Sequence, residues 1–446
     1  MKKFLSLLVS LGFVISCLAQ DLSSKLDTLV SAYEKTHKFN GSALVARQGT
    51  ILLNKGYGLR DASTGARNNE NSIFQIGSVT KQFTATVIQK LQEEKKLSVQ
   101  DKVSKFFPDY PKGDSITIEH LLTHTSGIFS YTSDRVFMST EVSKPQTREQ
   151  MMALFKDKPL QFAPGTNWQY SNSAYSLLGY IIEVVTKKPY EQVVREYIFK
   201  PVQMTHSGFD FAHLKKPERA TGYFVLNDVD TVKSPIVDSS VAYSAGAIYS
   251  TTGDLLRWHK ALQNYAILPK PLQEKAYTPI RNNYGYGWII DSIEGKRKVS
   301  HGGGIHGFTS NFARIPEDDI VVILLSNNSS PALQEMTNKI FQALYNRSYD
   351  LPMEHKAISL SEEKLKEYVG EYEITPELHL KLSVKDGQLL AEPTGQASAT
   401  VYAEKEDYFF VKKPDVQLQF TRNDKKEVTG FTLFQNGTTR TCKKIK

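Results

Sequence analysis

The sequence contains almost no cysteine. Its 446 residues include only two, Cys17 and Cys442. Because Cys17 falls in a leader-like N-terminal stretch, we expect the mature chain to keep a single thiol and to fold without an internal disulfide. No cysteine and histidine cluster has the spacing of a zinc site. The sequence therefore excludes a small domain held together by disulfides or by structural zinc.

Charge of one sign is not concentrated anywhere. Lysine and arginine number 55, aspartate and glutamate number 47, and the formal net charge is +8. The basic residues are spread along the chain and no nucleic-acid motif is present, so no nucleic-acid partner is expected. With 40% hydrophobic and 23% charged residues, the composition is that of an ordinary soluble globular protein, and the length suggests more than one domain.

An apolar run long enough to span a membrane is also lacking, since the stretch from Phe4 to Val14 is too short. This stretch follows Lys2 and Lys3 and ends in small residues, which predicts a secretory signal peptide over residues 1–19. The alternative is a lipobox-like stretch whose Cys17 is lipidated. Both interpretations predict an exported chain without a transmembrane segment in its mature form. It would be periplasmic or secreted after signal-peptide cleavage, or anchored as a lipoprotein through Cys17 in the alternative.

Strand-like patterns lie at both ends of the first 350 residues. Residues 42–58 resemble a hairpin and residues 284–327 contain further alternating runs, whereas residues 97–263 are mostly helical in pattern. The simplest assembly is an α/β domain over residues 20–350. It would have one antiparallel sheet formed from N- and C-terminal strands, flanked by helices, and a helical subdomain. Residues 351–446 alternate between turn signals, which predicts a small all-β, barrel-like domain.

The clearest chemistry is carried by Ser78 and Lys81, in the stretch QIGSVTKQFTATVIQKL. An apolar helix is predicted to begin here, so the two side chains would share one face. A lysine in the first turn meets the positive end of the helix dipole, and burial disfavours its charge further, so its pKa should fall below about 10.4. A neutral amine can take the serine proton and activate the hydroxyl as a nucleophile.

A Ser-x-x-Lys tetrapeptide is a weak signal by itself and belongs more often to a surface than to an active site. A second copy runs from Ser361 to Lys364 in a charged segment, and we assign it no role. The copy at Ser78 differs because it follows Gly77 and opens an apolar helix.

A second candidate element is Tyr170-Ser171-Asn172, which follows a Pro-Gly turn and precedes a predicted helix. Tyrosine can shuttle a proton if a nearby cation lowers its pKa from about 10. The amide of Asn172 can hold both a substrate carbonyl and a lysine. The alternative interpretation is a capped helix start with a packed aromatic residue.

The third candidate element is the stretch VSHGGGIHGF. Gly302, Gly303 and Gly304 would weaken a strand, and they are expected where a ligand approaches the backbone closely. His301 would present its imidazole beside that ligand. The alternative is a glycine-rich turn with a solvated histidine. No role is assigned to the neighbouring His306.

In this order, Ser-x-x-Lys, Tyr-x-Asn and His-Gly-Gly resemble the motifs of the serine beta-lactamase and penicillin-binding-protein superfamily. The resemblance is closest to the class C branch, with its D-aminopeptidases, D-alanyl-D-alanine carboxypeptidases and esterases. The phrases TIEHLLTHTSGI, APGTNWQYSNSAY, AGAIYSTTGDLLRW and YGYGW also fit. The resemblance covers roughly residues 25–346. The C-terminal part looks like the lipocalin-like β domain that often follows such hydrolases.

The resemblance implies a role for each matching residue. Ser78 would be the acylated nucleophile, and Lys81 and Tyr170 would share proton transfer as a coupled pair. Asn172 would orient the substrate. The backbone N–H groups of Ser78 and Gly304 would form the oxyanion hole. No metal and no organic cofactor are implied.

The third motif departs from the class C beta-lactamases, which carry Lys-Thr-Gly where this sequence has His301-Gly302-Gly303. These three residues would line the substrate pocket. A histidine is mostly neutral at pH 7, and Gly302 lacks a hydroxyl donor. Recognition of a beta-lactam carboxylate is therefore expected to be weak, and esterase or peptidase action is favoured over antibiotic hydrolysis.

The expected function is an exported serine hydrolase that cleaves ester or amide bonds of small molecules or short peptides. Its type would be an esterase or a D-amino-acid peptidase or carboxypeptidase, and cell-wall-derived peptides are one candidate source of substrate. One alternative is a beta-lactamase or a penicillin-binding sensor. The other is a catalytically silent cell-wall binding protein, which the presence of Lys81 disfavours. The sequence predicts no oligomeric state.

Overall fold

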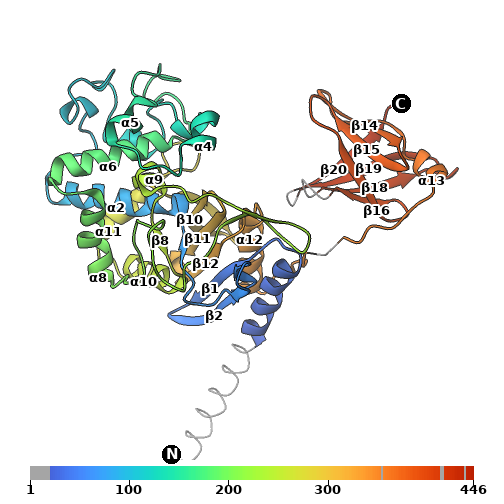
Figure 1. Ribbon diagram of the computed structural model, residues 1–446, viewed down its shortest axis with the longest axis horizontal. Helices are drawn as coiled ribbons and strands as arrows, with labels where there is room; N and C mark the ends of the chain where they lie inside the picture. Colours follow the sequence, from blue (N-terminus) through green and yellow to red (C-terminus); the bar gives the residue numbers. More distant parts are fainter. Residues whose placement is uncertain (1–20, 353–354, 412–415, 436–437) are drawn as a thin grey trace, which may run out of the picture. The chain divides into compact units, whose positions relative to one another are not determined.

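The computed structural model describes residues 21–352, 355–411, 416–435 and 438–446. The signal peptide expected over residues 1–19, and Cys17 with it, lie outside these ranges. The chain divides into two compact units, Met1–Pro352 and Met353–Lys446 (Figure 1).

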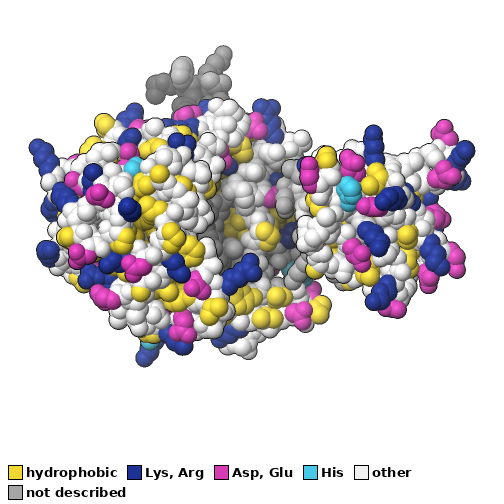
Figure 2. Space-filling model, turned by 90° about the horizontal axis from the view of Figure 1, so that it is seen from above, with side chains coloured by type: hydrophobic (Ala, Val, Ile, Leu, Met, Phe, Trp, Pro, Cys, Tyr) yellow, Lys and Arg dark blue, Asp and Glu magenta, His cyan; other side chains and the backbone are white. Residues whose placement is uncertain are grey.

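The described surface carries charges of both signs. On the face drawn in Figure 2, acidic and basic side chains are interspersed and form no extended patch of one sign. This face agrees with the even spread of charge along the sequence. Within the described ranges, no helix has both the length and the apolar character needed to cross a membrane.

A six-stranded antiparallel sheet forms the centre of the first unit, in the order β2-β1-β12-β11-β10-β9. Two strands come from the N-terminal end of the unit and four from its C-terminal end, which confirms the predicted α/β sheet. The strands are β2 (Thr50–Tyr57), β1 (Gly41–Arg47), β12 (Ile320–Ser326), β11 (Phe308–Ile315), β10 (Lys296–Ile305) and β9 (Ile289–Ile293).

Both faces of this sheet are buried, as its central strand β12 shows. Leu324 belongs to a core shared with the helix over residues 21–35 and with α12 (Leu333–Leu344). Ile323, one residue earlier, belongs to the larger core that contains α2 (Thr80–Glu93). Successive side chains of a strand point to opposite faces. A strand between two cores is therefore expected to be apolar on both faces, as β12 is from Ile320 to Leu325.

Further helices and short strands complete the first unit and include the expected helical subdomain. The helices are α3 (Ile118–Leu122), α4 (Arg135–Thr140), α5 (Arg148–Ala153), α6 (Asn172–Thr186), α7 (Tyr190–Val194), α8 (Lys200–Val202), α9 (Ser239–Gly246), α10 (Thr252–Gln263) and α11 (Lys270–Ala276). The short strands are β3 (Leu59–Asp61), β4 (Ala66–Arg67), β5 (Phe74–Gln75), β6 (Tyr223–Leu226), β7 (Thr231–Lys233) and β8 (Tyr249–Ser250).

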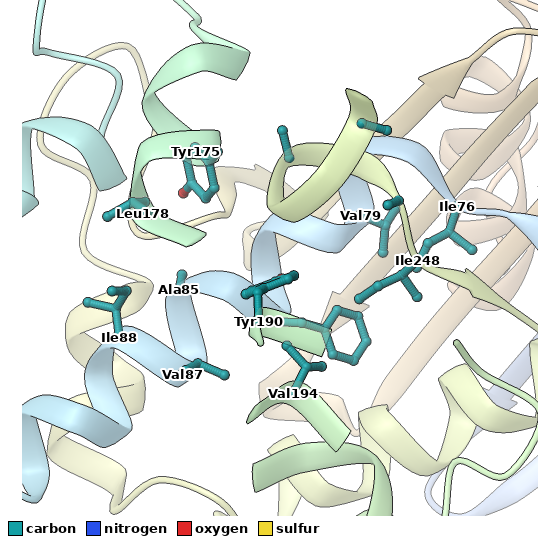
Figure 3. Close-up of a cluster of buried hydrophobic side chains, with 14 of the residues drawn as sticks. Ile76, Val79, Ala85, Val87, Ile88, Tyr175, Leu178, Tyr190, Val194 and Ile248 are labelled. Atoms are coloured by element: carbon teal, nitrogen blue, oxygen red, sulfur yellow. The ribbon is translucent and has the colours of Figure 1, made fainter. Parts of the chain in front are cut away.

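Helix α2 is buried on almost every side, unlike an amphipathic surface helix. Tyr175 and Leu178 of α6 and Tyr190 and Val194 of α7 lie around it (Figure 3). Of its 14 residues, 11 are buried, and Lys81 is one of them. The first turn of this helix therefore holds its lysine inside the protein rather than in water.

The second unit is a closed barrel of eight antiparallel strands, which confirms the expected all-β, barrel-like domain. Its core is filled by its own side chains, including the contacting rings of Tyr372, Phe420 and Phe431, and it contains the free thiol of Cys442. The elements are α13 (Glu362–Lys366), β13 (Gly370–Thr375), β14 (Leu378–Lys385), β15 (Gln388–Pro393), β16 (Ala399–Lys405), β17 (Tyr408–Val411), β18 (Val416–Arg422), β19 (Val428–Gln435) and β20 (Thr438–Lys444).

Candidate active site

Ser78 lies in a tight turn that leads into α2. After β5 the chain forms a 3-10 turn, η1 (Gly77–Val79), and α2 follows directly, so Ser78 precedes the α-helix rather than starting it. Gly77 has a φ of +50°, and a Cβ there would lie 2.9 Å from the backbone nitrogen of Gly304 on β10. Glycine has no Cβ, so it tolerates both the positive φ and the close approach of β10. The turn thus brings Ser78 beside the glycine segment of β10.

Lys81 places its amine against Ser78. Its Nζ lies 3.1 Å from Oγ of Ser78, 2.8 Å from Oδ1 of Asn172 and 2.8 Å from the carbonyl oxygen of Ala245. An amide oxygen and a carbonyl oxygen can only accept hydrogen bonds, so they take two N–H bonds of the amine. In a neutral amine the remaining direction is the lone pair, which faces the Ser78 hydroxyl. Three oxygen neighbours suit either an ammonium group with three N–H bonds or an uncharged amine with two N–H bonds and a lone pair, and burial decides between the two.

Burial favours that uncharged form. Lys81 is 0% exposed, and its removal from water holds the pKa of its amine well below the usual value. The direction of the shift is the one expected from the sequence. The amine is therefore suited to accept a proton at neutral pH.

Tyr170 lies against the same amine, with its ring centroid 4.9 Å from Nζ of Lys81. Burial raises the pKa of the Tyr170 phenol above its usual value, and a hydrogen bond with Ser78 only partly offsets this rise. The condition named for proton shuttling, a phenol pKa lowered by a nearby cation, is therefore not met. The physical reason is that Lys81, the neighbour in question, is itself held toward its neutral form. Tyr170 is a protonated phenol at neutral pH.

Asn172 is the first residue of α6, and its amide is held at both ends. Its Oδ1 accepts from Lys81, while its Nδ2 donates to Oγ1 of Thr132 at 3.1 Å. Its backbone N–H donates to Oγ of Ser130 at 3.1 Å. The alternative interpretation of a capped helix start also holds, because Oγ of Ser171 accepts from the backbone at the start of α6. The amide is thus oriented with its oxygen toward Lys81.

His301 lies on β10, but both of its ring nitrogens are already bonded. Nδ1 is 2.6 Å from the carbonyl oxygen of Gly302, and Nε2 is 2.8 Å from Oη of Tyr284. Because a carbonyl only accepts, Nδ1 carries the proton and Nε2 accepts from the tyrosine. His301 is 3% exposed, and burial is the main cause that lowers its pKa to about 3. The imidazole expected beside a ligand thus lies on β10, but neither of its ring nitrogens is free to bind one.

The three glycines of β10 differ in their surroundings and therefore in their structural roles. A Cβ on Gly303 would lie 2.0 Å from the carbonyl oxygen of Ile76 and 2.3 Å from Oγ of Ser310, whereas one on Gly304 would meet nothing within 4 Å. Gly302 and Gly304 are exposed and leave the strand open to a ligand. Close approach of a ligand, the reason expected for all three glycines, does not explain Gly303. That glycine lets β10 pack against the segment before Ser78.

Replacing Gly303 by alanine is expected to destabilise the protein by roughly 1–3 kcal/mol, because the added methyl group overlaps the carbonyl of Ile76. The displaced segment carries Ser78, so acylation should slow as well. Denaturant unfolding and the labelling rate of Ser78 with a fluorophosphonate probe measure the two effects. Gly304→Ala is the matched control for stability, since it makes the same change in open space on the same strand. An equal loss of stability in both variants would contradict this account.

Sequence reasoning missed the contacts that come from common residue types or from the backbone. The carbonyl of Ala245 and the hydroxyls of Thr132 and Tyr284 are the main ones. Ala245 and Tyr284 lie in AGAIYSTTGDLLRW and YGYGW, phrases that matched the family without indicating a role. A backbone carbonyl leaves no mark in a sequence, so no signal could have pointed to Ala245.

The second Ser-x-x-Lys tetrapeptide has a structural role in the barrel unit. Oγ of Ser361 accepts from the backbone N–H of Lys364 at 3.3 Å and caps α13. Nζ of Lys364 pairs with Glu367 and Glu406. These contacts agree with assigning no chemistry to this copy. In the part of the chain that the structure describes, no group of three or more His, Cys, Asp or Glu residues is placed to hold a metal ion.

Comparison with known protein families matches residues 26–346 to the family described as Beta-lactamase. Residues 354–443 match a family described as Domain of unknown function (DUF3471). The first match covers well over half of the chain.

Individual proteins agree with this match. The putative penicillin-binding protein PbpX of Bacillus subtilis (strain 168) is 35% identical over 317 residues, which are 71% of this chain and 78% of that protein. The structure of an octameric penicillin-binding protein homologue from Pyrococcus abyssi aligns with a TM-score of 0.69 and 26% identity, and covers 94% of this chain and 99% of that one.

A D-stereospecific amidohydrolase from Streptomyces sp. aligns with a TM-score of 0.60 and 26% identity, over 70% of this chain and 97% of its own. Order of motifs, sheet topology and family match thus agree. The chain belongs to the beta-lactamase family and is a serine hydrolase.

Proposed function

We propose that this protein is an exported hydrolase that cleaves ester or amide bonds of small substrates through an acyl-enzyme on Ser78. The observation that carries the proposal is the buried amine of Lys81, which directs two N–H bonds at Asn172 and Ala245 and faces Ser78 in the third direction. The similarity to a D-stereospecific amidohydrolase supports amides of D-amino acids as candidate substrates. The leader-like N-terminal sequence supports export.

The proposed reaction begins when Oγ of Ser78 attacks the substrate carbonyl carbon while its proton passes to Nζ of Lys81. The backbone N–H groups of Ser78 and Gly304 would stabilise the oxyanion. The C–O or C–N bond then breaks, and the leaving group departs with a proton delivered through the phenol of Tyr170, which is replenished from Lys81. Water attacks the acyl-enzyme by the reverse sequence of proton movements and releases the acid. Lys81 and Tyr170 end in their starting protonation states.

The hydrogen bonding of His301, whose ring lies near Tyr170, supports an esterase or D-amino-acid peptidase over a beta-lactamase. His301 is neutral and both of its ring nitrogens are used by Gly302 and Tyr284. It therefore supplies neither a positive charge nor a free donor for a substrate carboxylate. Small esters and amides without a carboxylate beside the scissile bond are the substrates that this arrangement fits.

Covalent labelling tests the proposal. The purified protein is incubated with a fluorophosphonate probe, and in parallel with a fluorescent penicillin, and the modified peptide is mapped; Ser78→Ala is the control. Labelling at Ser78 together with turnover of p-nitrophenyl esters or D-amino-acid amides is the expected result. A stable penicillin adduct without ester turnover would favour a sensor, and rapid cephalosporin turnover a beta-lactamase. Absence of labelling would favour a catalytically silent binding protein.

The acylation rate is expected to rise with pH and then to reach a plateau. The amine must be neutral to accept a proton, and burial lowers the pKa of Lys81, so the rise ends well below the pKa of an ordinary lysine. The phenol of Tyr170 keeps its proton because burial raises its pKa, so no decline is expected below about pH 10. Probe-labelling rates across this range measure the profile. A rate that still rises at pH 10 would show that Lys81 is not neutral in the folded protein.

A further inference from the structure

His124 lies beside the active site and has no role in the reaction proposed above. It follows α3, in the stretch TIEHLLTHTSGI, and is 0% exposed. Its backbone has a φ of +59°, a left-handed conformation that is uncommon for residues other than glycine. A buried histidine in this conformation lowers the stability of the fold. The contacts that His124 makes therefore indicate its role.

His124 holds the chain on both sides of Tyr170. Its carbonyl oxygen accepts from the backbone N–H of Gln169 at 3.0 Å. Its ring Nδ1 accepts from the backbone N–H of Ser171 at 3.1 Å. One residue thus binds the backbone N–H groups of the two residues that flank the tyrosine.

The ring of His124 also packs against the tyrosine ring itself. The centroids of the His124 and Tyr170 rings are 4.2 Å apart, with the planes inclined by 37°. Tyr284 and Tyr175 lie near the same imidazole, at centroid distances of 4.6 Å and 5.1 Å. The amine of Lys81 lies 4.9 Å from the centroid of the same Tyr170 ring. The position of Tyr170 relative to this amine therefore depends on its contacts with His124.

The hydrogen bonds of the imidazole fix its protonation. Because Nδ1 accepts from Ser171, the proton of the neutral ring lies on Nε2. Nε2 is buried and has no partner among the residues that the structure describes. Burial holds the pKa of His124 well below its usual value. The ring is thus retained despite an unpaired buried N–H, which lowers the stability of the folded protein.

We propose that His124 is a positioning residue that sets the Tyr170 ring against the amine of Lys81. This inference rests on the proposed function, in which Tyr170 carries a proton. His124 does not touch the reacting atoms in this scheme. It acts by fixing the backbone on both sides of Tyr170 and one face of its ring.

His124→Asn tests the proposal. Asparagine tolerates a positive φ and its Oδ1 can still accept from Ser171, but it has no ring to pack against Tyr170. We expect the acylation rate of Ser78 to fall by about 10- to 100-fold while KM for a small ester stays unchanged, because a misplacement of about 1 Å is enough for such a loss. His120→Asn is the matched control. It makes the same change on α3 at a histidine whose ring caps that helix, and it should leave the rate unchanged.

A double-variant cycle with Tyr170→Phe separates positioning from a general loss of structure. If His124 acts through Tyr170, His124→Asn should change the rate less than about threefold once Tyr170 is phenylalanine. Losses that multiply in the double variant would overturn the inference and leave the proposed function intact. A Tyr170→Phe variant that acylates at the parent rate would instead refute the proposed proton transfer, and the inference with it.

A second variant keeps the test decisive if His124→Asn does not fold. His124→Phe keeps a ring beside Tyr170 and removes only the acceptor for Ser171. It should lose part of the rate, and that loss should again vanish in the Tyr170→Phe background. A parent-like rate for a folded His124→Phe variant would show that the bond to Ser171 has no positioning role.

Discussion

Replacing Lys81 by methionine is expected to lower the acylation rate of Ser78 by about 10³-fold or more while the fold persists. Methionine fills the buried volume but offers neither a lone pair nor an N–H bond. The Ser78 proton then has no acceptor, and the oxygens of Asn172 and Ala245 lose their common donor. The labelling rate with a fluorophosphonate probe measures the effect.

The matched control is Lys90→Met, which removes a lysine from the same helix at a partly exposed position. It should acylate at the parent rate. A Lys81→Met variant that also acylates at that rate would rule out the amine as the proton acceptor. Circular dichroism of both variants would show whether a lost rate reflects lost structure.

The same variant makes a prediction about stability. The pKa of Lys81 is lowered in the folded protein, so between that pKa and the unfolded value near 10.5 the unfolded chain binds one more proton than the folded chain. Stability of the parent protein then rises with pH, by up to about 1.4 kcal/mol per pH unit for this group. Lys81→Met lacks this contribution. Its free energy of unfolding should therefore fall relative to that of the parent as pH rises from 7 to 9, and parallel curves would contradict a neutral buried Lys81.

Replacing Tyr170 by phenylalanine is expected to slow acylation by about 100-fold, the range of a lost proton donor. The ring remains against Lys81 and His124, so the change removes only the hydroxyl that bonds Ser78. The loss should grow with the basicity of the leaving group, because a poor leaving group needs the proton most. Rates for a series of phenyl and alkyl esters measure this trend.

Tyr110→Phe is the matched control for Tyr170→Phe. Tyr110 is a buried tyrosine of the same unit, and the change removes one hydroxyl from it as well. It should leave both the rate and its dependence on the leaving group unchanged. An unchanged dependence on the leaving group in Tyr170→Phe would mean that the phenol does not deliver the proton.

The parts of the site that are close in sequence could be predicted from the sequence. Ser78 and Lys81 are three residues apart, so helical geometry alone brings them together. The sheet could be predicted because the strands at both ends of the unit are apolar and extended. The barrel followed from turns at regular intervals between alternating runs.

The parts of the site that depend on contacts between residues far apart in the chain could not be predicted from the sequence. The carbonyl of Ala245 lies 164 residues from Lys81 along the chain, and no pattern connects the two. The hydrogen bond from Tyr284 to His301 occupies a ring nitrogen, and the sequence gives no sign that this nitrogen has a partner. The pKa of Tyr170 depends on how far Lys81 is withdrawn from water, which only the packing around α2 determines.

The pairing of β1 with β12 has a consequence for how the protein is made. Val45 of β1 lies opposite Val322 of β12, so the middle of the sheet joins the two ends of the first unit. During synthesis the edge of β1 that pairs with β12 stays unpaired until nearly the whole unit has been translated. Such high contact order slows folding. We therefore expect the nucleophile turn, which lies between these strands in the chain, to be assembled only after translation of the unit is complete.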